Sequence, residues 1–364
     1  MNARYLQRMR LLPAAVLTTM LAAACSEPPP PIDVVRLSQT ADTVIVPVVQ
    51  LAEARPLSDG RWVLLAPVEM QLQLVDFAAH AATPFPQMTS AEVPGPGTLM
   101  AAGDTLLVGD WGLQRVTRWL VGRPRLEAVP IPAGAGGALP RARDAAGQWY
   151  FEGALDAGRD GRGLRDSALV IRGDAMLVRF DTIAHLAPPD LVMVQREGGA
   201  RFERRVLSGR DKWGVFHDGT LYIARFRGNV VEWRNPDGTL AARTKPLPDP
   251  ILPVKEMDRQ IYLRRFPEDQ RQAARSQTFA ELKPPFEAAF GTVDRRVWLF
   301  KSAPALDSIR TFQVVDTTGL KLIVEVPSRG TALGVTGEWI LMGEEFPAGI
   351  RLLRYPVPVA ARGN

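Results

Sequence analysis

Residues 212–224 read KWGVFHDGTLYIA, and this stretch decides the fold. A short apolar segment leads into Asp218 and Gly219, and a run of bulky apolar residues follows them. Two apolar runs joined by a turn that contains Gly predict a β-hairpin. A further apolar run at 229–235 predicts a third strand beside the hairpin.

This pattern of a hairpin and a following strand occurs six times along the chain. The hairpins occupy 54–66, 97–109, 141–153, 212–224, 288–300 and 331–343. The strands that follow them occupy 71–77, 114–121, 166–172, 229–235, 308–316 and 349–355. The hairpin turns lie at Gly60, Gly103, Gly147, Gly219, Arg296 and Gly337, with intervals of 43, 44, 72, 77 and 41 residues. A spacing of about 40 to 45 residues is typical of a four-stranded propeller blade. The sequence therefore predicts an all-β fold, a six-bladed β-propeller over 42–360, in preference to an irregular β-sandwich.

The two long intervals require insertions. The first contains the Gly-rich and Asp-rich segment 153–165 and a predicted hairpin at 191–207 that turns on Gly198 and Gly199. The second covers 259–282, and its later part, 266–282, predicts a short surface helix that begins near Pro267.

Closure of a propeller ring requires a strand from the far end of the chain. The segment 42–50 precedes the first repeat and has the composition of a strand, whereas the sixth repeat is followed by little further chain. We expect 42–50 to complete the last blade as its outer strand, because an unpaired edge would otherwise be exposed.

The N-terminus carries Arg4, Arg8 and Arg10 and then an apolar run at 11–24. This run is too short to span a bilayer, which takes about 20 residues. A basic start, a short apolar segment and small residues before a cut are typical of a secretory signal peptide over 1–24. Cys25, the only cysteine, follows directly.

The Ala-Ala-Ala-Cys junction resembles the bacterial lipoprotein signal, although Ala22 stands where leucine is usual. The resemblance implies that Cys25 is lipidated on sulfur and attaches the protein to a membrane. An ordinary cleaved signal with an incidental cysteine is the alternative. Segment 25–41 is then a linker stiffened by Pro28 to Pro31. By resemblance to the sorting rule of enteric bacteria, Ser26 after the cysteine implies an outer-membrane location facing the periplasm, or the cell surface, so the protein is expected to be extracytoplasmic.

The composition argues against a nucleic-acid partner. The chain has 44 basic and 39 acidic residues, and three of the basic ones lie in the predicted signal peptide. The mature protein is therefore close to neutral and lacks a strongly basic character. Its 46% hydrophobic content is ample for a core.

The blade sequences at 210–240 and 283–300 resemble the TolB-like or NHL-like six-bladed propeller lipoproteins of Gram-negative bacteria. The resemblance extends over essentially the whole mature chain. It implies the fold and the location, and it implies no particular chemistry.

The sequence contains no strong catalytic signature. His-Glu-x-x-His, Cys-x-x-Cys, Gly-x-Ser-x-Gly and a phosphate-binding loop are all absent. We therefore predict no catalytic residue, no metal and no cofactor. The three histidines fall in different repeats and are expected in loops or turns: His80, His185 and His217.

A metal-dependent hydrolase or lyase similar to gluconolactonase is the alternative function. That family's cation-binding pattern of acidic and Asn side chains is not matched, because the mature chain has only Asn229, Asn235 and Asn364. A calcium site formed by Asp156, Asp160 and Asp166 is conceivable, but three arginines in the same segment favour a solvated insertion.

A binding surface is expected where the second strand of each repeat ends, because these turns lie on one face of a propeller. Trp111 is the first candidate, since it lies between glycines in a predicted loop, whereas Trp62, Trp149, Trp298 and Trp339 are expected in the core. The candidate binding face consists of Trp111, Asp110, Glu69, Glu152, Arg225, Arg227, Lys301, Glu344 and Glu345. We expect a lipid-anchored binding or scaffolding protein for an envelope partner or a small ligand.

Overall fold

The computed structural model describes residues 32–38, 42–85, 93–102, 105–120, 127–153, 168–196, 199–249 and 252–362. The chain divides into a unit at Met1–Pro31 and a compact unit at Ile32–Asn364. The predicted signal peptide, Cys25 and the conceivable calcium loop with Asp156, Asp160 and Asp166 lie outside the described residues. No helix in the described ranges is long and apolar enough to cross a membrane.

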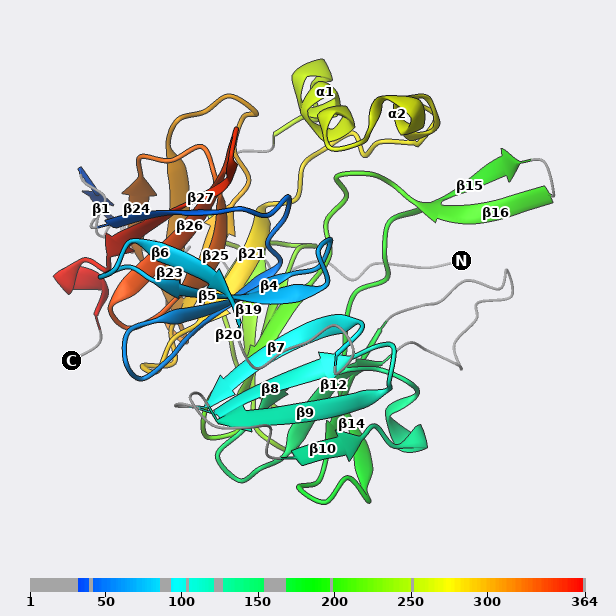
Figure 1. The fold of residues 1–364 in the computed structure, drawn as a ribbon, viewed down its shortest axis with the longest axis vertical. Helices are drawn as coiled ribbons and strands as arrows, with labels where there is room; N and C mark the ends of the chain where they lie inside the picture. The colour runs from blue at the N-terminus through cyan, green and yellow to red at the C-terminus, as the bar shows by residue number, and fades with distance from the viewer. Residues whose placement is uncertain are drawn as a thin grey trace, which may run out of the picture. The chain divides into compact units, whose positions relative to one another are not determined.

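The fold is nearly all-β, with short antiparallel sheets in chain order (Figure 1). One sheet contains β3 (Glu53–Pro56), β4 (Trp62–Ala66), β5 (Gln71–Asp76) and β6 (Ala81–Pro84). The next contains β7 (Pro96–Ala102), β8 (Thr105–Asp110), β9 (Arg115–Leu120) and β10 (Glu127–Pro130). After the 3-10 helix η1 (Ala133–Ala135) comes the sheet of β11 (Pro140–Arg143), β12 (Trp149–Gly153), β13 (Leu169–Gly173) and β14 (Phe180–His185).

The second half of the chain repeats this organisation. One sheet contains β17 (Lys212–Val215), β18 (Leu221–Arg225), β19 (Val230–Arg234) and β20 (Leu240–Arg243). Another contains β21 (Phe286–Gly291), β22 (Val297–Lys301), β23 (Arg310–Asp316), β24 (Gly319–Val326) and β1 (Asp33–Arg36). The last contains β25 (Thr331–Val335), β26 (Trp339–Phe346), β27 (Gly349–Pro356) and β2 (Asp42–Val46), and the 3-10 helix η2 (Val359–Ala361) follows.

Each sheet buries both of its faces against its neighbours. Within β4, Trp62 and Leu64 belong to a buried cluster shared with the last sheet, while Val63 belongs to a cluster shared with the following sheet. Analogous buried clusters lie between every two successive sheets in the chain. Because neighbouring side chains of a strand point to opposite faces, a strand covered on both faces is apolar throughout.

The first strands of the sheets contact one another in chain order. β7 contacts β3 and β11, β17 contacts β11 and β21, and β25 contacts β21 and β3. The hairpins that the sequence predicted are therefore the first and second strands of successive sheets.

The tryptophan predictions are largely confirmed. Trp62, Trp149 and Trp298 are buried, whereas Trp339 is half-buried. Its ring packs against the cluster formed by the first and last sheets, and the Arg354 guanidinium carbon lies 4.3 Å from the ring centre.

The N-terminal segment contributes two strands. β2 pairs antiparallel with β27 and ends at Val46, earlier than the predicted 42–50, as Val48 N–H donates to the Val46 carbonyl in a tight turn. β1, which lies in the segment predicted as linker, pairs parallel with β24. Arg354 of β27 is 2.5 Å from Asp42 of β2, so an ion pair reinforces the first of these pairings.

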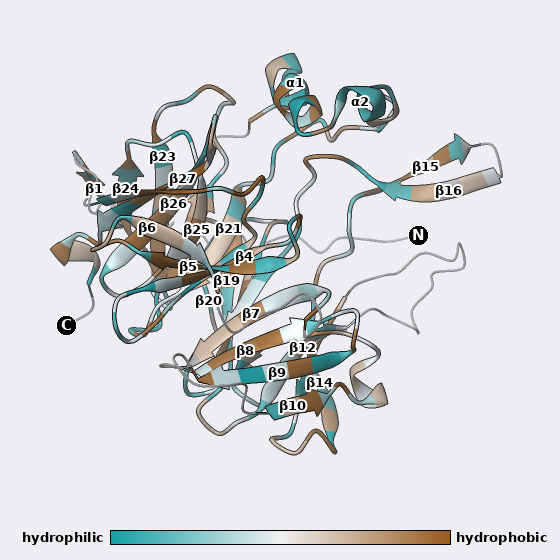
Figure 2. Cartoon of the chain, viewed as in Figure 1, coloured by the Kyte–Doolittle hydropathy of each residue, from teal (hydrophilic) through white to brown (hydrophobic). Residues whose placement is uncertain are grey.

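The insertions adopt their own local structures. The predicted hairpin is present as β15 (Leu191–Arg196) and β16 (Gly199–Arg204), and Gly198 lies outside the described residues. The short helix predicted to begin near Pro267 is present as α2 (Glu268–Arg275), although it ends earlier than 282, and a second helix, α1 (Glu256–Arg264), was not predicted. Pro267 separates them, and the chain after α2 is extended because it bonds to neighbouring backbone. Figure 2 shows that α2 is mostly hydrophilic, in agreement with its exposed side chains.

The pairing of β2 with β27 can be tested by the same substitution at two neighbouring residues of β2 that point to opposite faces of the sheet. Val46 is fully buried, whereas the neighbouring Ile45 is 44% exposed. Val46→Asp should lower the free energy of unfolding by at least about 2 kcal/mol, because it buries an unpaired polar group. Chemical denaturation measures this loss. Ile45→Asp is the matched control, and an equal loss from both variants would contradict the register.

Candidate functional site

The candidate site lies at the end of the sheets where the second strand stops and the first begins. Adjacent strands are antiparallel, so these two points share one end of each sheet. At this end, a polar side chain at or just after the end of the second strand bonds to the segment that leads into the first strand. The Glu69 carboxylate accepts the Val49 N–H at 2.6 Å, and the Lys301 ammonium lies 2.7 Å from Asp249.

The predicted Glu344 and Glu152 have similar contacts in other sheets. One Glu344 oxygen accepts bonds from the Ser328 hydroxyl at 2.8 Å and from the Arg329 N–H at 2.9 Å. Glu152 accepts a bond from the Trp213 indole N–H at 2.8 Å. Burial alone would raise the pKa of Glu344, but the Arg351 guanidinium and these donors hold it below its usual value.

The tightest of these ties surrounds Asp211, whose side chain is fully buried. Its carboxylate accepts bonds from Arg225 at 2.8 Å, from the Ala187 N–H at 2.8 Å and from the Phe226 N–H at 3.1 Å. Arg225 also bonds to Glu232 at 2.8 Å. The buried charge is thus fully paired, which is the condition for tolerating it.

The structure leaves three of the predicted residues on the surface. Trp111 is 53% exposed, and Arg227 and Glu345 are exposed as well. Asp110 is completely buried at the end of β8, and one of its oxygens accepts the Leu113 N–H at 3.0 Å. The predicted residues therefore share one end of the sheets, and several use their polar atoms to hold it together. A binding role for them stays a prediction.

Trp111 has a defined position. The backbone N–H of Trp111 donates to the Gly95 carbonyl at 2.8 Å, and the indole ring lies over Gly97. A Cβ at Gly97 would be only 2.2 Å from the indole nitrogen, so glycine is required for this close approach. The ring is thus supported from below and accessible from outside.

Exposed apolar side chains accompany Trp111 at this end. They lie in the turns between second and third strands or at the last residue of the second strand: Val68, Met70, Leu113, Leu306, Ile309 and Phe346. Single exposed apolar residues are normal in soluble proteins, and these share with Trp111 the same end of their sheets. Of the exposed apolar residues at this end, only Trp111 was predicted from the sequence. The exposure of the others depends on the conformation of the turns, which the sequence does not show.

Both described insertions emerge from this same end. The hairpin β15–β16 lies between β14 and β17, and the helices α1 and α2 lie between β20 and β21. The two insertions are joined by backbone bonds from the Val206 N–H to the Thr278 carbonyl and from the Ala280 N–H to the Val206 carbonyl. The Tyr262 hydroxyl donates to the Gln277 side chain at 2.8 Å, which ties α1 to the same segment.

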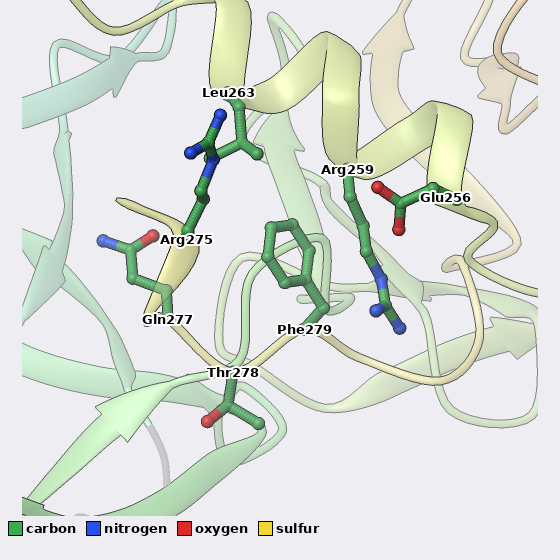
Figure 3. Close-up of a pocket in the computed structure, with 7 residues that line it drawn as sticks. All are labelled: Glu256, Arg259, Leu263, Arg275, Gln277, Thr278 and Phe279. Carbon is green, nitrogen blue, oxygen red and sulfur yellow. The ribbon is translucent and has the colours of Figure 1, made fainter. Parts of the chain in front are cut away.

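Two hollows border α1. The larger, about 980 Å³, lies between the residues that follow the hairpin and both helices, and Arg204, Tyr262 and Phe266 line it. The smaller, about 390 Å³, is shown in Figure 3, where Phe279 lies between Arg259 and Arg275. The sequence analysis missed both hollows, because they form between two insertions distant in the sequence.

A group of basic side chains adjoins the larger hollow. Burial, together with the charges of Arg210 and Arg204, lowers the pKa of Lys212 to about 8. Glu152 acts in the opposite direction, and Arg141 adds a further positive charge. Arg141 itself lies 3.6 Å from Glu152. The balance of charge around Lys212 is therefore positive.

Histidine and carboxylate side chains do not form a metal site in the described part of the chain, where no three His, Cys, Asp or Glu residues gather. His80, His185 and His217 are exposed and belong to three different sheets or their turns.

Comparisons with known proteins identify the fold class. No protein-family model matches the sequence, and no curated protein matches it. The structure of U3-55K is similar over 87% of this chain and 99% of that chain, with a TM-score of 0.50 and 10% identity. Together with the arrangement of the sheets, this similarity shows that the chain has a β-propeller fold.

Two further solved structures are similar at lower scores. Regucalcin, a calcium-binding protein from Agrobacterium tumefaciens, has a TM-score of 0.46 and 8% identity over 88% of this chain and 94% of its own. Virginiamycin B lyase from Staphylococcus aureus has a TM-score of 0.46 and 10% identity over 87% and 99%. At these scores, nothing about the activity of this chain follows from either protein.

The tie around Asp211 makes a prediction about stability. Asp211→Ala removes the acceptor of one Arg225 hydrogen bond and of two backbone N–H groups, while Arg225 keeps its bond to Glu232, so the free energy of unfolding should fall by about 2 to 4 kcal/mol. Urea denaturation measures the change. Asp237→Ala is the control, because Asp237 is exposed and bonds only to Thr239 in its own turn. A similar loss in both variants would show that the tie contributes no special stability.

The lowered pKa of Lys212 makes a prediction about pH. An unfolded lysine has a pKa of about 10.4, so between pH 8 and 10 the unfolded chain binds more protons at this position than the folded one. The contribution of Lys212 to stability therefore rises with pH in this interval. Wild type should gain unfolding free energy relative to Lys212→Met from pH 7 to pH 9.5. Lys245→Met, which removes an exposed lysine, is the control, and parallel curves for wild type and Lys212→Met would contradict the shift.

Proposed function

We propose that the protein is a lipid-anchored, extracytoplasmic β-propeller that binds an envelope partner through the end of the sheets that carries Trp111. The exposed indole of Trp111, supported by Gly97 and accompanied by apolar turn residues, is the observation that carries this proposal. Accessible aromatic side chains in rigid positions are the usual anchors of protein interfaces.

The proposed architecture is a six-bladed ring. Buried clusters between successive sheets, including one between the first and last sheets, support it. In this ring β2 is the outer strand of the last blade, which joins the two ends of the described chain. A ring would place all turns between second and third strands on one face and so bring the apolar turn residues together.

The proposed membrane attachment depends on the sequence around Cys25. The basic start, the apolar run at 11–24 and the small residues before Cys25 support a lipoprotein signal. The likeness to TolB-like or NHL-like propeller lipoproteins supports the same location.

The anchor is tested by Cys25→Ala in the full chain. The variant should move from the membrane fraction to the soluble fraction without a change in melting temperature, because Cys25 precedes the compact unit. Membrane fractionation with a salt wash measures the partition. A variant that stays with the membranes after the wash would exclude the lipid anchor.

The binding face is tested by site-specific photo-crosslinking in cells. A crosslinking residue at Met70 or Leu113, which lie in turns at the same end of the sheets as Trp111, should trap an envelope protein, and Trp111→Ala should reduce the yield about tenfold or more, as expected for an interface hot spot. Val293 is the control position, because it is 92% exposed in the turn between β21 and β22, at the opposite end of its sheet. Equal products at Val293 and Met70, or no product at Met70 and Leu113, would overturn the proposal.

A further inference from the structure

The larger hollow beside α1 combines an apolar wall with a positive one. Phe202, Tyr262 and Phe266 supply aromatic surface, and Phe202 is 41% exposed. Arg204 supplies a guanidinium on the same lining. A volume of about 980 Å³ lies in the range that accommodates small organic ligands.

We propose that this hollow binds a small organic anion, with its apolar body against Phe202, Tyr262 and Phe266 and its phosphate or carboxylate group at Arg204. This inference goes beyond the proposed partner binding, since the site uses neither Trp111 nor the turns between second and third strands.

Arg204 is prepared for an anion. Its Nε and Nη2 atoms donate to the Ser208 hydroxyl and carbonyl at 3.1 and 2.7 Å, which fixes the plane of the guanidinium. Within the described residues, Nη1 has no hydrogen bond to protein. A fixed, planar guanidinium with free donors is the group that recognises phosphate and carboxylate best.

The surroundings of Arg204 lack a spare negative charge. Asp190 is paired with Arg205 at 3.4 Å, and Glu152 already accepts the Trp213 indole N–H. Glu203, the acidic residue among those that line the hollow, has an interaction partner of its own. Burial and the charge of Arg210 lower the pKa of Arg204, so a bound anion would relieve an unfavourable charge balance.

The two insertions hold the hollow open. The backbone bonds between Val206 and the segment 278–280 join its floor to the segment that follows α2. Tyr262 is also fixed by ring contacts with Phe266 at 5.2 Å and with Phe279 at 5.5 Å. A preformed site loses little conformational freedom when a ligand binds.

The probe for the test is 1-naphthyl phosphate. Inorganic phosphate, which lacks the aromatic rings, and 1-naphthol, which lacks the phosphate group, are the comparison ligands. Calorimetric titration of the mature chain should give tighter binding for 1-naphthyl phosphate than for either comparison ligand. Arg204→Met should weaken binding about tenfold or more, the value of a charge-assisted hydrogen bond. Arg179→Met, on the exposed turn between β13 and β14, is the control and should leave binding unchanged.

A second variant protects the test against misfolding of Arg204→Met. Phe202→Ser removes aromatic surface at an exposed position and should weaken 1-naphthyl phosphate while leaving inorganic phosphate unchanged. Wild-type binding should also weaken from pH 7 to pH 9, as Lys212 loses its proton among Arg210, Arg204, Arg141 and Glu152, and Lys212→Met should lack this dependence.

The outcomes separate this proposal from the proposed partner binding. Equal affinity for 1-naphthol and 1-naphthyl phosphate, no measurable binding, or equal losses in Arg204→Met and Arg179→Met would overturn the anion site. The crosslinking result at Met70 and Leu113 would be unaffected by any of these findings.

Discussion

Burial of both faces of every sheet is the constraint on which the rest of the structure depends. A four-stranded antiparallel sheet with one wet face would show alternating polar and apolar residues. Here β4 is buried at every position from Trp62 to Ala66, and β22 is buried from Val297 to Lys301. Neither sheet could cover this much apolar surface alone, so each needs a neighbour on both sides. The cluster between the first and last sheets meets this need at the ends of the chain.

The polar side chains at the ends of the second strands complement this packing. The buried clusters hold the sheets against one another, but they do not determine where the chain enters each sheet. Hydrogen bonds accepted by Glu69 and Glu344, and one donated by Lys301, position these entrances. The surface that remains accessible is then divided between apolar turn residues and the basic hollow beside α1. The protein thus has a rigid frame with two chemically different surfaces at one end of its sheets.

The sequence analysis and the structure agree where a signal is local. Alternating turns and apolar runs located the hairpins, and the β-propeller class follows from their spacing. The analysis also placed Trp111 on the surface, because a residue flanked by glycines in a turn has little to pack against. It failed at α1, whose nine residues before Pro267 have few apolar positions. Asp110 was predicted on the binding face, but it is completely buried at the end of β8.

The sequence by itself determined the repeated hairpins and, through their spacing, the propeller class, because both depend on neighbouring residues. Only the tertiary structure decided which polar residues are used internally. Lys301 and Asp249 are 52 residues apart along the chain, so no local pattern links them, yet they meet in a largely buried ion pair. The hollow beside α1 likewise exists only because backbone bonds join Val206 to a segment more than seventy residues later. Contacts between residues distant in the sequence depend on how the folded chain brings segments together and excludes water from them. A local sequence pattern does not contain this information.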